Sequence, residues 1–108
     1  MPGYAWVLEV RPGYEEEYLK RHDAIWPEML DCLRAAGIRN YNIFRHGLTL
    51  FGFFETDDLA ATKAALRASD VDKRWSEWMA PIMKIEVDPQ TQTQTQFPDL
   101  LPKQFYME

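Results

Sequence analysis

A proline that follows a stripe of aromatic side chains limits how the first half of the chain can fold. Tyr18, His22 and Trp26 recur at every fourth residue, which places them on one face of a helix, about 40° apart. Pro27 has no backbone N–H, and its ring disfavours helical geometry at Trp26. We therefore expect a helix over residues 14–25 to end or kink at this point, which puts His22 near a rim.

The stripe by itself has two interpretations. Histidine is the side chain that titrates near neutral pH without help, so His22 is a candidate for proton transfer. A tyrosine and a tryptophan at helical spacing are more often core residues, and a lone histidine is more often satisfied by a neighbour. Tyr18 and Trp26 are therefore consistent with core packing as well as with a binding site.

The composition predicts one domain over residues 1–108, because 46% hydrophobic residues in a chain of 108 suffice for one core. The net charge of -5 disfavours nucleic-acid binding. Cys32 is the sole cysteine, so no intrachain disulfide can form and a cytoplasmic location is expected. No apolar run approaches the ~20 residues that span a bilayer, and the N-terminus does not read as a signal peptide.

Hydrophobic periodicity predicts strands and helices in a definite order. The alternation at residues 4–10 is typical of a strand, and Gly37 is well placed to cap a second helix. The third helix is expected to turn small alanines toward the core, with Leu59 and Leu66 as larger anchors. The fourth is expected to turn an apolar stripe that includes Trp78 toward it. The elements expected after 4–10 are helices over 14–25 and 27–36, strands over 38–45 and 48–55 joined at His46-Gly47, and helices over about 58–68 and 70–82.

The C-terminal part changes in composition. Residues 88–102 hold prolines around a Thr-Gln repeat and are expected to be a polar connector without fixed structure. Residues 103–108 are apolar again and are expected to dock as a C-terminal strand, on this subunit or on a second one by exchange. The order of elements predicts an α+β fold, a ferredoxin-like antiparallel sheet with helices on one face.

The sequence contains no Gly-rich phosphate loop, no serine nucleophile elbow and no Cys/His metal spacing, so no metal site is expected. His46 is expected to be a turn histidine in solvent. His22, the aromatic residues and polar groups such as Asn40, Arg74 and Glu28 suit a neutral, hydroxylated ligand. Aromatic faces can pack on the C–H face of a sugar ring, and histidine can supply proton transfer, typically worth ~10²–10⁴-fold in rate.

These residues resemble the signature of the L-rhamnose mutarotase family. The similarity covers nearly the whole chain in the family's order: Tyr18 to His22, Ile25-Trp26-Pro27-Glu28, Asn40-Tyr41, Arg74-Trp75 and the aromatic tail Phe105-Tyr106. The resemblance implies an isomerase without a cofactor, a homodimeric α+β barrel that interconverts the α and β anomers of a 6-deoxy hexose, most of all L-rhamnose.

The resemblance also implies roles for single residues. His22 would be the acid/base, and Tyr18 beside it would orient or assist it. Tyr41 and Trp75 would hold the sugar ring, and Tyr18 would also contact the substrate. One group with a pKa near neutrality, helped by a phenol or by water, can serve both ring opening and ring closure.

Two segments depart from the family's pattern. Ser76 follows Trp75 where many members carry a second tryptophan, and Trp78 is expected to pack in the core instead of replacing it. Residues 86–89 read Glu-Val-Asp-Pro, where the family usually has Asn-Pro-Asp-Asn-Ser-Pro or similar. Both departures lie where the family's pocket would be closed, so L-fucose is an alternative substrate for the same reaction.

Two other classes of function are alternatives. A cofactor-free monooxygenase or haem-degrading protein of the dimeric α+β barrel type would use His22, Trp75 and Asn40, by analogy of fold. A non-catalytic binding module would tolerate loss of the His22 imidazole.

Overall fold

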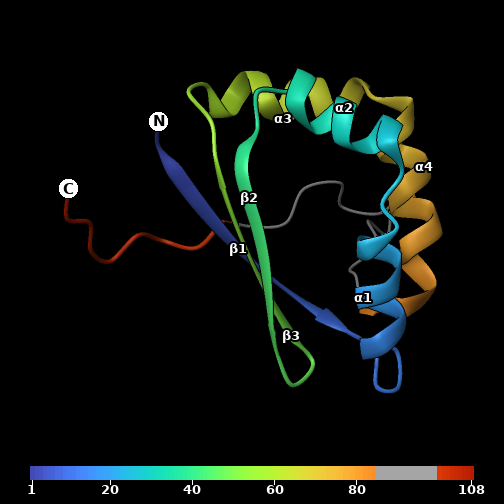
Figure 1. Ribbon diagram of the computed structural model, residues 1–108. Coiled ribbons are helices and arrows are strands. Elements are labelled where there is room, and N and C mark those ends of the chain that lie inside the picture. The colour runs from blue at the N-terminus through green and yellow to red at the C-terminus, as the bar shows by residue number, and fades with distance from the viewer. Residues whose placement is uncertain (85–99) are drawn as a thin grey trace, which may run out of the picture.

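The computed structural model describes residues 1–84 and 100–108, and in these residues four helices lie on one side of an antiparallel sheet (Figure 1). The strand order is β2-β3-β1-β4, as in a ferredoxin-like sheet, so the predicted fold class is confirmed. The elements are β1 (Gly3–Val10), α1 (Glu15–Asp23), α2 (Pro27–Ala35), β2 (Arg39–His46), β3 (Thr49–Glu55), α3 (Leu59–Ala68), α4 (Asp70–Met79), the 3-10 turn η1 (Ala80–Ile82) and β4 (Met83–Lys84).

Pro27 separates α1 from α2, as predicted. Trp26 has an extended backbone with ψ 133°, the conformation that a following proline favours. Pro27 then occupies the first turn of α2, where its missing N–H costs nothing. Gly37, with φ 90°, follows the end of α2 in the left-handed region. Side-chain oxygens of Asp58 and Ser69 cap α3 and α4.

The core lies between the inner face of the sheet and the helices. β1 alternates as predicted, so that Trp6 and Val10 are buried on its inner face. Leu50 and Phe54 of β3 are buried on the same face. None of the helices in the described parts of the chain is long and apolar enough to cross a membrane.

The buried face of α3 differs from the prediction, because its alanines are exposed. Of the two expected anchors, Leu66 is buried and Leu59 is partly buried, whereas Thr62 is buried where alanines were expected. The Thr62 hydroxyl donates to the Ala36 carbonyl at 2.7 Å and lies 2.8 Å from the Thr56 hydroxyl. A threonine whose polar group is satisfied in this way can face the core.

The end of the last helix also differs. α4 ends at Met79 instead of near residue 82, because Pro81 disfavours its continuation. The chain passes through η1 and forms β4, in which Met83 pairs antiparallel with Val10 of β1. The edge of the sheet is therefore made by residues directly after the helix expected over 70–82, where no strand was predicted.

Residues 103–108 form no strand in this single chain. Leu100 bridges to Trp6, and the Leu101 N–H donates to the Ala5 carbonyl at 2.7 Å. A longer strand would need a partner strand for its own N–H and C=O groups. Docking of this segment on a second subunit stays a prediction, and most of the expected connector at 88–102 lies outside the described residues.

Candidate active site

A cavity of about 510 Å³ opens between the inner face of the sheet and the helices. Its lining is mainly apolar with a few polar groups, as is usual for small-molecule sites. Tyr18 and His22 come from α1, Tyr41 from β2 and Trp75 from α4. The structure thus brings together the four residues that the sequence nominated for catalysis and substrate binding.

The imidazole of His22 is held in a defined tautomer. Its Nδ1 lies 3.0 Å from the backbone carbonyl oxygen of Tyr18. A carbonyl can only accept a hydrogen bond, so Nδ1 carries the proton and Nε2 the lone pair. Burial lowers the pKa of His22, although the Tyr18 carbonyl and Asp23 act in the opposite direction. The ring is therefore neutral at neutral pH, and Nε2 can accept a proton.

Aromatic rings fix the plane of this imidazole. The Tyr18 ring stacks on His22 with centroids 4.2 Å apart, and Trp75 meets it edge-on at 5.3 Å. Tyr18 and His22 face each other because they are four residues apart on α1. Burial raises the pKa of the Tyr18 phenol, so this hydroxyl stays protonated and can donate a hydrogen bond.

Tyr41 is positioned by a tryptophan that the sequence analysis did not nominate. The Trp6 Nε1–H donates to the Tyr41 hydroxyl oxygen at 3.0 Å. Although 37% of the Tyr41 residue is exposed, its hydroxyl end is enclosed, and burial raises its pKa to about 12. Because its oxygen already accepts from Trp6, the Tyr41 O–H remains available to donate to a ligand.

Gly52 makes this arrangement possible. It pairs with Trp6 across β1 and β3, and a Cβ at Gly52 would overlap the Trp6 indole. The contact depends on the register of β1 against β3, so the sequence pattern alone could not identify it.

Asp72 is the main site residue that sequence reasoning missed. It lines the cavity, is only 7% exposed, and its Oδ2 accepts no hydrogen bond within the described parts of the chain. Burial raises the pKa of this carboxyl to about 6. The available signal was its spacing, because Asp72 precedes Trp75 by three residues and therefore shares its face of α4.

Two tryptophans lie outside the cavity lining. Trp26 stacks on Trp78 at 5.3 Å and meets Trp75 edge-on at 5.1 Å. Trp78 is 39% exposed, so the prediction that it packs in the core is wrong. The guanidinium of Arg21 lies 4.3 Å from the Trp78 ring centroid and covers it from α1, which lets the indole stay at the surface.

The polar groups expected near a ligand also lie elsewhere. Asn40 donates to Glu55 at 3.1 Å, and Arg74 forms ion pairs with Asp70 at 3.0 Å and Glu28 at 3.5 Å. The His22, Trp75 and Asn40 set of the haem-degrading alternative is therefore not assembled around the cavity.

His46 and possible metal ligands were the remaining candidates. His46 is exposed at the end of β2. Within residues 1–84 and 100–108 no group of three or more His, Cys, Asp or Glu side chains could hold a metal ion.

The sequence matches curated relatives along most of its length. The family model described as L-rhamnose mutarotase matches residues 3–107. An L-rhamnose mutarotase from Listeria monocytogenes serotype 4b (strain F2365) is 42% identical over 86 residues, which cover 78% of this chain and 82% of the relative. Another from Burkholderia orbicola (strain MC0-3) is 43% identical over 84 residues, covering 77% and 81%.

Solved structures agree with the fold. The crystal structure of an L-rhamnose mutarotase from Formosa agariphila superposes with a TM-score of 0.78 at 29% identity, over all of both chains. The tetracenomycin F2 cyclase from Streptomyces glaucescens, a type-II polyketide cyclase, gives a TM-score of 0.60 at 14% identity, over 100% of this chain and 98% of that one. The second likeness concerns the fold alone.

Proposed function

The chain belongs to the L-rhamnose mutarotase family, and on that premise we propose that it interconverts the α and β anomers of L-rhamnose. The observation that carries the proposal is the neutral, oriented imidazole of His22 in a largely apolar cavity. Opening a sugar ring needs a base at the anomeric hydroxyl and an acid at the ring oxygen. A cavity with one titratable imidazole and two phenols offers both.

His22 acts first as the base. Its Nε2 removes the proton from the hydroxyl on C1, the bond between C1 and the ring oxygen breaks, and the ring oxygen takes up a proton from the Tyr18 phenol or from water. The product is the open-chain aldehyde, which rotates about the C1–C2 bond. The reverse transfers close the ring on the other face of the carbonyl, and no atom or electron is gained or lost. Burial supports this role, because it keeps Nε2 unprotonated at neutral pH.

The aromatic residues hold and assist the substrate. The Tyr18 phenol, stacked on His22, orients the imidazole and assists proton transfer. The Tyr41 hydroxyl donates to a sugar oxygen, a role that the Trp6 N–H supports by occupying its acceptor side. Trp75 packs against the apolar C–H face of the sugar ring.

Anomer exchange can be measured directly by saturation-transfer proton NMR. One anomeric signal of L-rhamnose is irradiated with and without the wild-type protein, and the experiment is repeated with L-fucose. We expect exchange of L-rhamnose above the buffer rate, and faster than that of L-fucose. Faster exchange of L-fucose would overturn the substrate assignment, and exchange of neither sugar would overturn the proposed activity.

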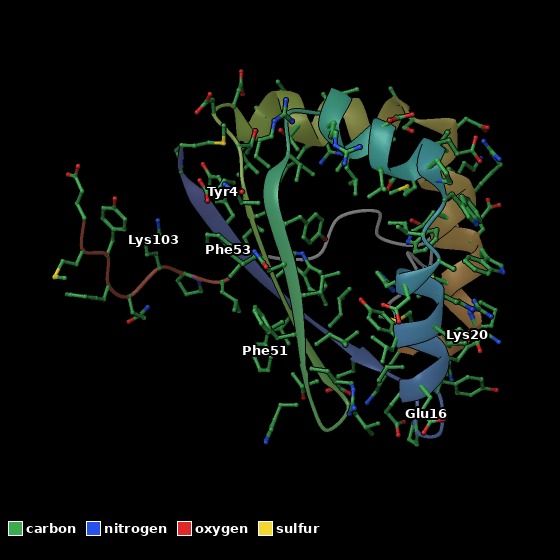
Figure 2. The ribbon with its side chains drawn as sticks, in the orientation of Figure 1. Tyr4, Glu16, Lys20, Phe51, Phe53 and Lys103 are labelled. Carbon is green, nitrogen blue, oxygen red and sulfur yellow. The ribbon has the colours of Figure 1, made fainter. Side chains whose placement is uncertain are left out.

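We also propose that the protein is a homodimer formed through the outer face of the sheet. Phe44 and Phe51 are paired across β2 and β3 and share this face with Phe53. They are 64%, 41% and 39% exposed. Figure 2 shows Phe51 and Phe53 on the side of the sheet away from the helices, where the segment with Lys103 also runs. An apolar patch of this kind is typical of an interface.

The C-terminal segment supplies the test of the dimer. Phe105, Tyr106 and Met107 are 81%, 71% and 80% exposed in the single chain, so they have apolar surface to bury. Deletion of residues 103–108 is expected to weaken association in sedimentation velocity, compared with the full chain at the same concentrations. An intact dimer of unchanged stability after the deletion would count against an exchanged tail.

A further inference from the structure

Asp72 lines the cavity and carries an acceptor atom that is not used within the described residues. An ionised carboxylate can only accept hydrogen bonds, at about four lone-pair sites. Its Oδ2 is buried and accepts none within the described residues, although the whole side chain is only 7% exposed. A buried acceptor without a donor is costly and rare in native proteins.

The surroundings of Asp72 make a structural ion pair a poor explanation. Among the described residues that line the cavity there is no lysine and no arginine. The nearby Arg74 of the same helix is paired with Asp70 and Glu28 on the outside. A buried carboxylate without a cation is destabilising by itself, so its place in this cavity calls for a donor that arrives from outside.

Asp72 lies among the groups that would hold the sugar. It is close enough to Tyr41 that its charge helps to raise the pKa of that phenol. Ser76 is one helical turn further along α4, on the same face, and also lines the cavity. The Ser76 hydroxyl can donate or accept a hydrogen bond beside the carboxylate.

We propose that Asp72, with Ser76 beside it, is a specificity-determining residue whose carboxylate accepts a hydrogen bond from one ring hydroxyl of the bound sugar. The inference rests on the proposed function, because it requires a sugar in this cavity. A site built to bond a substrate hydroxyl rejects the analogue that lacks it, since the buried protein group is then left unpaired.

The proposal is tested by a double-mutant cycle in which one change removes the Asp72 carboxylate and the other removes one hydroxyl of the sugar. The substrates are L-rhamnose and its 2-deoxy, 3-deoxy and 4-deoxy analogues, and kcat/KM for anomer exchange is measured for each. The proteins are the wild type, Asp72→Leu, the near-isosteric Asp72→Asn, and Asp70→Asn as a control, because Asp70 is an exposed carboxylate on the same helix.

In the wild type and in Asp70→Asn, one deoxy sugar is expected to lose about 10- to 100-fold in kcat/KM, the usual range for a hydrogen bond to a charged group. In Asp72→Leu, removal of the same sugar hydroxyl is expected to lower kcat/KM by less than about twofold. In Asp72→Asn it is expected to lower kcat/KM by an intermediate factor. Asp72→Asn keeps the test valid if Asp72→Leu does not fold.

Three results would overturn the proposal. The first is that each deoxy sugar loses the same factor in kcat/KM, relative to L-rhamnose, in the wild type as in both Asp72 variants. The second is a wild type that turns over all three analogues as well as L-rhamnose. The third is a uniform loss with every sugar in the Asp72 variants, which indicates a structural or general catalytic role. In all three results the wild type still accelerates the anomer exchange of L-rhamnose. If the proposed function itself fails, the wild type does not accelerate this exchange, so the two kinds of failure can be told apart.

Discussion

Replacement of Asp72 by asparagine should change how the stability of the protein depends on pH. The folded state releases the Asp72 proton near pH 6, whereas an ordinary aspartate releases it near 3.8. Between these values the folded state binds more protons than the unfolded state, so the contribution of Asp72 to stability falls as pH rises. The difference of about two pKa units, at 1.36 kcal/mol each, amounts to about 3 kcal/mol.

The assay is urea denaturation at fixed protein concentration from pH 4 to pH 7, followed by tryptophan fluorescence. The free energy of unfolding of Asp72→Asn minus that of the wild type is expected to increase by about 2 kcal/mol across this range, most of the full effect, because the ordinary aspartate has already begun to titrate at pH 4. If the asparagine amide itself stabilises or destabilises the protein by an amount that does not depend on pH, that amount cancels, because only the change of the difference with pH is compared. Asp57→Asn, at an exposed position, is the control and should give a nearly constant difference. A constant difference for Asp72→Asn as well would refute the reasoning.

Three further perturbations test other parts of the site. In the wild type, kcat/KM should rise with pH through a pKa below 6.5 and then level off, because the unprotonated His22 is the active form; a fall over this range in a pH–rate profile would contradict it. Gly52→Ala forces the Trp6 indole to move and should cost about 1–3 kcal/mol in urea denaturation; unchanged stability would argue against the tight contact. Tyr41→Phe removes a donor to the sugar and should raise KM by up to about tenfold with little change in kcat; an unchanged KM would exclude that hydrogen bond.

The sequence was sufficient wherever a local signal decided the outcome. Pro27 fixed the boundary between α1 and α2, and the four-residue spacing of Tyr18 and His22 placed both rings at one cavity. Trp75 and Tyr41 were found by their likeness to a family motif, and the structure places both in the lining. These predictions depend on residues close in sequence or on a motif that carries its own context.

The remaining features depend on tertiary contacts. Thr62 faces the core because its hydroxyl reaches the Ala36 carbonyl, which belongs to another part of the chain. In the sequence, Asp72 looks like a solvent-exposed acid of a helix, but the folded chain buries it. Trp78 looks like a core residue, but it lies at the surface, where Arg21 covers it. Pairing of Trp6 with Gly52 depends on strand register, which the periodicity of each strand does not specify.

The central claim is that His22 transfers the proton that opens the sugar ring. The most direct measurement is saturation-transfer NMR of L-rhamnose with the wild type, His22→Ala and His46→Ala, because His46 is the other histidine and is exposed in the hairpin. We expect His22→Ala to lose at least about 100-fold in the rate of anomer exchange and His46→Ala to match the wild type. Exchange by His22→Ala at the wild-type rate would contradict the account.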